Sequence, residues 1–178
     1  PVAVAVPQDY RIKSDITVSF KEGKVTTFTK ESVGKALMPY FKTGNGENNQ
    51  VVPLKVENGY ATISLPDAEY GFSHLPYGYL NSKRKENLLI PRPVSEVYTY
   101  TIECPENMEL RTPRMYKAIS NTAGKLSIIV KKEGRTATVT RSLELSKQLY
   151  TPAEYKDLRQ LLTEWSDVNG KTLLFSVQ

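Results

Sequence analysis

Cysteine, histidine and tryptophan each occur only once in this chain of 178 residues, as Cys104, His74 and Trp165. A single cysteine excludes an intramolecular disulfide, but it does not identify a compartment, because the rule that links disulfides to oxidising compartments concerns mainly small disulfide-dependent domains. One histidine and one cysteine cannot supply a three-ligand zinc site without carboxylates from elsewhere in the chain. We therefore expect no bound metal and no cofactor.

Long apolar runs are missing too, and none approaches the roughly 20 residues that a membrane-spanning helix needs. The apolar start, residues 1–7, is too short for an intact signal peptide and lacks its basic residues. Because the chain does not begin with Met, we expect any export signal to lie upstream of it. The net charge is +5, but the basic residues are scattered among acidic ones. Nucleic-acid-binding proteins cluster such charge beside a recognisable motif, so we expect no nucleic-acid partner.

Strand-forming segments dominate what the sequence does contain. The clearest are residues 12–20, 25–29, 51–56, 60–65, 97–102, 126–130 and 136–145. Asn58-Gly59 separates two of them, and this pair predicts a tight hairpin because both residues tolerate positive φ. Pro53 has no N–H to give to a sheet, so residues 51–56 are expected at a sheet edge or with a bulge. The composition of residues 44–49 predicts a flexible loop.

One helix is predicted near the C-terminus, over residues 152–166. Thr151 can cap its first turn, Pro152 suits the first helical position, and Glu154 can complete a capping box. Apolar residues then recur at helical spacing and form one stripe: Tyr155, Leu158, Leu161, Leu162 and Trp165. A closing strand is predicted over residues 171–177. An amphipathic helix after so many strands indicates that it covers a sheet.

These patterns predict a mainly β protein, built as an antiparallel β-sandwich of immunoglobulin-like character. The helix is expected to pack on the sandwich, and the last strand to follow it. A change of composition near residue 87 divides the chain into an N-terminal β half, residues 1–87, and a C-terminal β half, residues 88–178. The two halves could equally form one continuous domain.

Cys104 and His74 are the one pair that could form a thiol nucleophile and its base. Cys104 ends an apolar strand and precedes Pro105, however, and an unpaired cysteine commonly behaves as a small buried apolar residue. No acid, base and nucleophile converge in the sequence, so we expect no catalytic residues and no enzyme in this chain.

An aromatic segment over residues 70–79 is the best candidate for a binding site. Its candidate ligand-binding residues are Tyr70, Phe72, His74, Tyr77 and Tyr79. Aromatic faces beside polar groups can stack on sugar rings or pack against a partner protein. The alternative is an irregular loop whose aromatic side chains pack on the protein itself.

Several sequence features occur in an order that resembles a known family. They are Ser32–Ala36, Ile63–Pro66, Leu88–Pro93, Ile102–Pro105, Arg141–Leu145 and the run Tyr150–Arg159 followed by Trp165. In this order they resemble the β-rich C-terminal region of Bacteroidetes-type transglutaminase-like (papain-like) envelope proteins, a domain family of unknown function. The order of the features carries the resemblance, since no single motif is specific.

The resemblance implies an exported protein of the periplasm or cell envelope. Its catalytic Cys, His and Asp would lie in an upstream transglutaminase-like domain of the same polypeptide, which would be the partner of this chain. The chain itself would be a non-catalytic accessory β-module of a larger transglutaminase- or protease-like protein, with a structural or interaction role. The alternative is a glycan- or peptide-binding module that uses residues 70–79.

Overall fold

The computed structural model describes residues 6–38, 45–68, 70–72, 81 and 83–178. Strands dominate it, which confirms a mainly β protein. The strands are β1 Arg11–Lys21, β2 Lys24–Val33, β3 Asn45–Pro53, β4 Tyr60–Ser64, β5 Leu88–Leu89, β6 Ser95–Glu103, β7 Met108–Leu110, β8 Met115–Asn121, β9 Gly124–Glu133, β10 Thr136–Leu145, β11 Leu149–Tyr150 and β12 Thr172–Val177. The helices are η1 Gln8–Tyr10, η2 Lys35–Leu37, α1 Tyr155–Trp165 and η4 Val168–Lys171.

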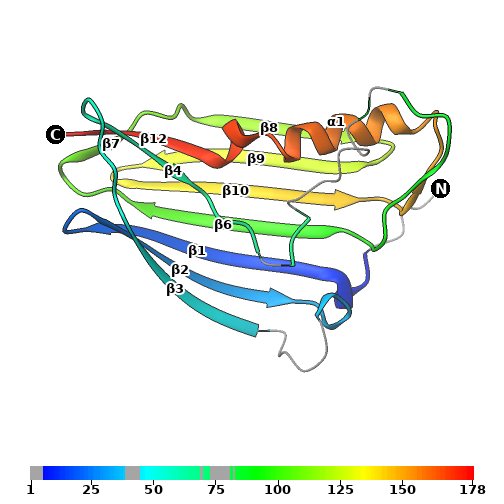
Figure 1. Ribbon diagram of the computed structural model, residues 1–178, viewed down its shortest axis with the longest axis horizontal. Helices are drawn as coiled ribbons and strands as arrows, with labels where there is room; N and C mark the ends of the chain where they lie inside the picture. Colours follow the sequence, from blue (N-terminus) through cyan, green and yellow to red (C-terminus); the bar gives the residue numbers. More distant parts are fainter. Residues whose placement is uncertain (1–5, 39–44, 69, 73–80, 82) are drawn as a thin grey trace.

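Seven strands form the main sheet, in the order β3-β2-β1-β6-β10-β9-β8. Each neighbouring pair is antiparallel except β1 and β6, which run parallel. The expectation of a purely antiparallel arrangement is therefore wrong at the centre of the sheet. After β3 the chain passes over the face of the sheet in a segment that we call the return pass, described over residues 54–68 and 70–72 (Figure 1). β6 then starts at the end of the sheet where β1 starts, so the two strands run in the same direction (Figure 1).

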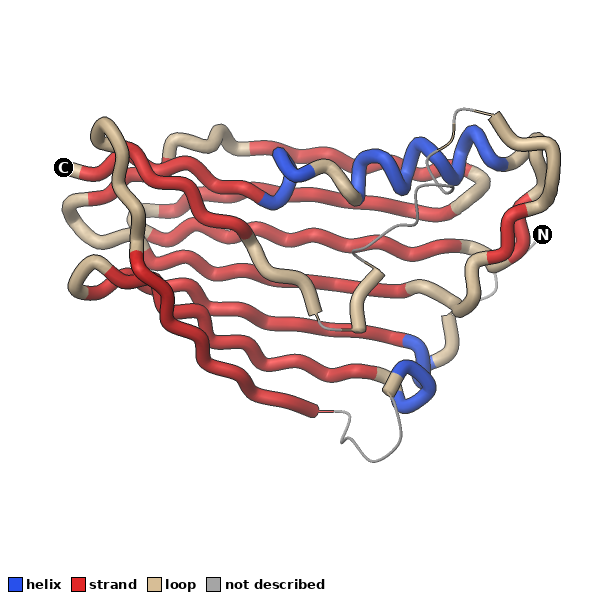
Figure 2. The backbone as a smooth tube through the Cα atoms, viewed as in Figure 1, coloured by secondary structure: helices blue, strands red, loops and turns tan. Residues whose placement is uncertain are grey.

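A second layer lies over one face of this sheet (Figures 1 and 2). It consists of the three-stranded sheet β4-β12-β7 and helix α1, while β11 and β5 form a short separate pair. The second layer lies over the part of the main sheet that contains β6, β10, β9 and β8, and it leaves much of β2 and β3 open. The core fills the space between the layers.

Alternation along the central strands produces that core. In β1, β6, β9 and β10 every second residue is buried, as a half-covered sheet requires. The largest fully buried apolar and aromatic side chains are Trp165, Tyr98, Tyr100, Tyr150, Phe175, Ile12, Ile90, Ile102, Leu126, Ile128 and Leu143. The predicted inward faces of residues 126–130 and 137–145 are confirmed.

Helix α1 begins and packs as its sequence predicts. The Thr151 hydroxyl accepts the Glu154 N–H at 3.4 Å, and the Glu154 carboxylate accepts the Thr151 N–H at 3.0 Å, which is a capping box. Residues 152–154 form a turn, so the regular helix, Tyr155–Trp165, is shorter than residues 152–166. All five residues of the predicted stripe are buried. The closing strand is β12.

Two local expectations about β3 and β4 are confirmed, and one is wrong. The tight turn at Asn58-Gly59 is confirmed: both residues adopt positive φ, at 52° and 79°, and Glu57 and Tyr60 exchange two backbone hydrogen bonds of 2.9 Å across it. The pairing extends no further, because β3 pairs with β2 and β4 pairs with β12. Residues 45–49, expected in a flexible loop, lie in β3, because their backbone groups pair with β2. Pro53 does lie in the edge strand of the sheet, as its missing N–H predicted.

Candidate functional site

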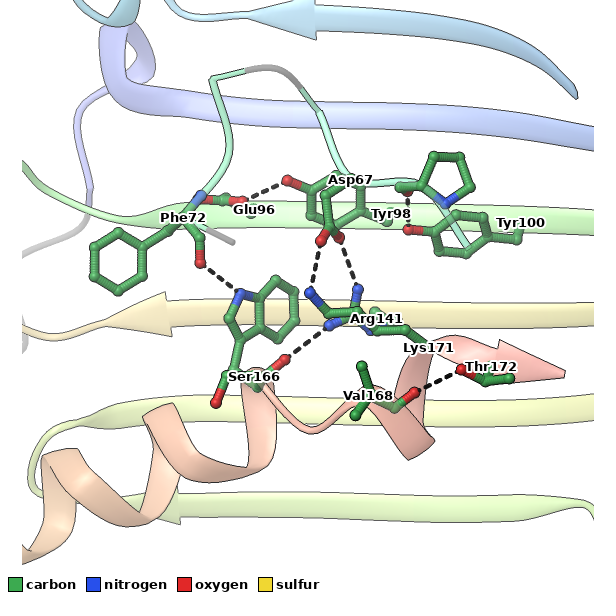
Figure 3. A network of polar contacts seen from close by, with 12 residues as sticks. Asp67, Phe72, Glu96, Tyr98, Tyr100, Arg141, Ser166, Val168, Lys171 and Thr172 are labelled. Atoms are coloured by element: carbon green, nitrogen blue, oxygen red, sulfur yellow. Dashed lines mark hydrogen bonds and ion pairs between the residues drawn. The ribbon is translucent and has the colours of Figure 1, made fainter. Parts of the chain in front are cut away.

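Two buried charged residues and a partly buried one gather between the two layers (Figure 3). Arg141 from β10 and Glu96 from β6 are buried, and Asp67 from the return pass is partly buried. Arg141 and Glu96 are 0% and 1% exposed. Charges are rarely buried unless they are paired, so the partners of these groups decide what the cluster can do.

Arg141 joins three elements through its guanidinium group. Nη1 donates to Asp67 Oδ1 at 2.8 Å, and Nη2 donates to the Trp165 carbonyl oxygen at 3.1 Å. The guanidinium carbon also lies 4.3 Å from the centre of the Trp165 ring, a cation–π contact. Lys171 Nζ reaches the other carboxylate oxygen of Asp67 at 2.7 Å. The return pass, the end of α1 and β10 are therefore connected through one buried arginine.

Glu96 anchors the return pass at a second point. One carboxylate oxygen accepts the Tyr98 hydroxyl, and the other accepts the Phe72 N–H at 2.7 Å, with Arg92 Nη2 at 3.4 Å. Burial raises the pKa of Glu96 above its ordinary value, and the bonds from Tyr98 and Phe72 and the charge of Arg92 oppose this rise only in part. At Gly71, a Cβ atom would lie 2.4 Å from the Tyr98 oxygen, so the close approach of the backbone requires glycine there.

Two further buried donors, one in β6 and one in α1, form hydrogen bonds to the backbone of the return pass. The Tyr100 hydroxyl donates to the Pro66 carbonyl oxygen at 2.6 Å, and Trp165 Nε1 donates to the Phe72 carbonyl oxygen at 3.0 Å. Burial raises the pKa of both Tyr98 and Tyr100, so both phenols stay protonated and act as hydrogen-bond donors. The side chains of Tyr98, Tyr100 and Trp165 therefore each donate a hydrogen bond to a partner within the protein. Through these bonds the cluster holds the two layers together.

The aromatic segment proposed from the sequence is described only in part. Phe72 is 8% exposed, and its backbone is bonded by Glu96 and Trp165 as described above. Tyr70 is half-buried, and its carbonyl oxygen accepts Arg92 Nη2 at 3.0 Å. His74, Tyr77 and Tyr79 lie outside the described residues. Ligand binding by this segment remains a prediction.

Cys104 lies half-buried after β6, where its N–H donates to the Arg135 carbonyl oxygen at 2.9 Å. Burial raises the pKa of its thiol, and the charges of Lys132 and Arg135 oppose that rise only in part. The thiol lines a cavity of about 270 Å³ at the end of the molecule where β7 and the last residues of the chain meet. A thiol with a raised pKa is a poor nucleophile at neutral pH. Its proposed base, His74, is outside the described residues.

The open part of the main sheet carries a polar groove that the sequence patterns did not reveal. Two cavities of about 370 and 400 Å³ lie over β2 and β3 and share Thr27, Gln50 and Pro66 as lining residues. Thr29 and Asn48 also line it. The groove exists because the return pass runs beside β2 and β3, and that contact between distant segments has no local signature.

Within the part of the chain that the structure describes, no three or more histidine, cysteine, aspartate or glutamate side chains come together as a metal site. No helix there combines the length and apolar character needed to cross a membrane.

Sequence analysis did not single out Arg141 as a buried charge, although a signal for this was present. It stands between Val139 and Leu143, in phase with the inward face of β10. A charged residue at an inward position requires a buried partner, and Asp67 supplies it from 74 positions away. The partner could not be found from spacing alone.

Comparisons with known proteins place this fold. A search of curated proteins gives no match to the sequence. Among solved structures, the chain is similar to the crystal structure of a putative protease from Parabacteroides distasonis, with 26% sequence identity and a TM-score of 0.59. The alignment covers 85% of this chain and 35% of that chain, so the present sequence spans about a third of that protein. Residues 60–175, more than half of the chain, match the family described as Domain of Unknown Function with solved-structure structure (DUF3858). The chain therefore belongs to this domain family.

Proposed function

We propose that this chain is a non-catalytic accessory β-module, immunoglobulin-like in character, of a larger transglutaminase- or protease-like protein. Its role is structural or one of interaction, and its partner is an upstream transglutaminase-like domain of the same polypeptide. We further propose that the whole protein is exported to the periplasm or cell envelope, as the resemblance to Bacteroidetes-type envelope proteins implies.

The observation that carries the proposal is the partial match to the P. distasonis protein. The similar region makes up 35% of that chain, which leaves most of its length for other domains. The chemistry of the buried cluster is consistent with a supporting role. Arg141, Glu96, Tyr98 and Tyr100 are all engaged in bonds within the protein, so they stabilise the fold and do not face a substrate.

The experiment uses the P. distasonis protein and a chimera in which the present chain replaces its similar region. We expect the chimera to retain hydrolysis of a peptide or protein substrate if the parent hydrolyses it. The present chain alone should hydrolyse none. Deleting the similar region from the P. distasonis protein should lower the thermal stability of that protein or raise its KM, but a slow reaction should persist. Full activity of the isolated chain would contradict the accessory role. So would a deletion variant with the same stability and kinetics as the parent protein.

A glycan- or peptide-binding module remains the second candidate, and the polar groove favours it. Among the described residues, no side-chain hydrogen bond occupies Thr27, Thr29, Asn48 or Gln50. Their hydroxyl and amide groups can both donate and accept, as the hydroxyls of a sugar or the amides of a peptide require. Titration with oligosaccharides and peptides, followed by NMR, tests this candidate. Shifts confined to residues 70–79 would favour the aromatic segment over the groove.

A further inference from the structure

The two edges of the main sheet differ in how they are protected. At one edge, β8 is tied to α1: Lys117 pairs with Glu164 at 2.7 Å, and Asn121 donates to the Asp157 carbonyl oxygen at 3.0 Å. At the other edge, β3 pairs with β2 only, and in Figure 1 no described element lies beyond it. An unprotected edge presents unpaired backbone groups to any strand that can reach them.

The backbone pattern shows which groups of β3 face outward. The N–H of Leu54 donates to the Gly23 carbonyl oxygen at 2.8 Å, so even-numbered residues direct their backbone groups toward β2. Odd-numbered residues therefore direct theirs away from the sheet. These are Asn45, Glu47, Asn49 and Val51, followed by Pro53, which has no N–H and ends the available run.

The composition of β3 gives little protection against pairing with another strand. It is nine residues long, and Glu47 is its single charged residue. Val51 and Val52 are 54% and 42% exposed. Natural sheets usually protect an edge of this length with lysines, bulges or inward-pointing charges.

We propose that β3 is a self-association edge, at which a second copy of this chain adds its own β3 in antiparallel pairing centred on Asn49. In this register, Glu47 lies opposite Val51 of the second copy, and Asn49 lies opposite itself. Asn45 lies opposite Pro53, so every outward-facing residue of β3 meets another one. Glu47, Asn49 and Val51 alone then give about six backbone hydrogen bonds across the junction. The two seven-stranded sheets become one continuous sheet.

A second copy fits this edge because the edge complements itself. A two-fold axis through Asn49 keeps the only charge, Glu47, away from its own counterpart, so no like charges face each other. The missing N–H of Pro53 falls at the outer end of the pairing, where it costs no central bond. A single strand pair buries a small area, so we expect a weak, concentration-dependent dimer.

The experiment is sedimentation velocity on the full 178-residue chain over a wide concentration series. We expect the average mass to rise toward that of a dimer as concentration increases. Asn49→Lys should keep the protein monomeric, because it places two lysines opposite each other across the two-fold axis. Asn49→Glu should do the same. Mixing the two variants should restore the dimer, since lysine then faces glutamate.

The matched control is Ala118→Lys, which adds the same charge to an exposed position of the opposite edge strand, β8. It should dimerise as the unmodified chain does. At concentrations where the unmodified chain is monomeric, circular dichroism should show the same melting curve for all variants, because both positions are exposed. A monomer at every concentration would overturn the proposal. So would a dimer that tolerates Asn49→Lys, or Lys and Glu variants that remain monomeric when mixed.

Discussion

At the scale of single residues, Arg141 shows how one side chain can connect segments far apart in the sequence. It binds Asp67 from the return pass and the Trp165 carbonyl group from the end of α1. Its position in β10 would normally hold an apolar residue. The ion pair is therefore not needed to fill the core, and we infer that it fixes which segment crosses the sheet at this point.

Arg141→Ala should lower the free energy of unfolding by about 3–5 kcal/mol, because it leaves buried polar partners without their cation. Urea denaturation followed by circular dichroism measures the change. Arg114→Ala is the matched control: its side chain is exposed, so its effect should stay within about 0.5 kcal/mol. Equal midpoints for both variants would show that Arg141 contributes no net stability.

Glu96 predicts a dependence of stability on pH. Its pKa is raised in the folded protein, mainly by burial, so the folded state keeps this proton at pH values where the unfolded chain has released it. The associated stability is present below the ordinary pKa of 4.5 and is lost as pH rises through the folded value. Glu96→Gln should remove this loss, so the variant should gain stability relative to the unmodified chain as pH rises.

Urea denaturation at several pH values from acid to neutral tests this sign. Glu106→Gln, at an exposed position, serves as the control and should follow the unmodified chain. A stability difference between Glu96→Gln and the unmodified chain that does not change with pH would contradict the role given to burial.

At the scale of elements, helix α1 was predictable because its signals are local. Thr151 and Glu154 form the expected capping box, and the stripe from Tyr155 to Trp165 is buried as its period predicts. The partner of β4 was not predictable in this way. Asn58-Gly59 makes the expected turn, but β4 joins β12, more than 100 residues later in the chain. Turn residues fix local backbone angles, whereas pairing depends on the complete fold.

Trp165→Ala should lower the free energy of unfolding by roughly 3–5 kcal/mol, the usual cost of truncating a large buried aromatic side chain. Trp165 also packs against the ring of Tyr98, with the ring centres 6.0 Å apart, and it donates to Phe72. Thr151→Ala should cost only about 1 kcal/mol through the lost cap. Chemical denaturation followed by circular dichroism compares the two with Thr163→Ala, an exposed control on the same helix. An unchanged midpoint for Trp165→Ala would show that the stripe does not stabilise this chain.

At the scale of the whole molecule, composition and alternation were sufficient to predict a mainly β protein with one covering helix. They could not predict the parallel contact of β1 with β6, because that contact joins residues 84 positions apart in the sequence, such as Arg11 and Ser95. The same holds for the buried cluster. Arg141 stands at an inward position of β10, which is a local signal, but its partner Asp67 lies 74 positions away and meets it only after the layers assemble.

The division at residue 87 can be tested directly. Residues 88–178 alone would lack β1, the neighbour of β6, and β4, the neighbour of β12. We expect this half to unfold without a cooperative transition, because it loses two strand partners and Asp67 together. Thermal melting followed by circular dichroism measures this. A cooperative transition with a native-like spectrum would support two independent halves.

The parallel pair at the centre of the sheet also has a mechanical consequence. In Figure 1, β1 starts at one end of the long axis and β12 finishes at the other, so tension between Arg11 and Val177 acts along the strands. The ladders on both sides of β1 would then be sheared together, whereas tension between Asn49 and Ala118, on the two edge strands, would open one ladder at a time. In single-molecule force spectroscopy, we expect a higher rupture force for the first pair of attachment points than for the second. Equal rupture forces would show that the ladders beside β1 do not limit rupture. With the expected difference in force, the module would resist stretching along one direction only.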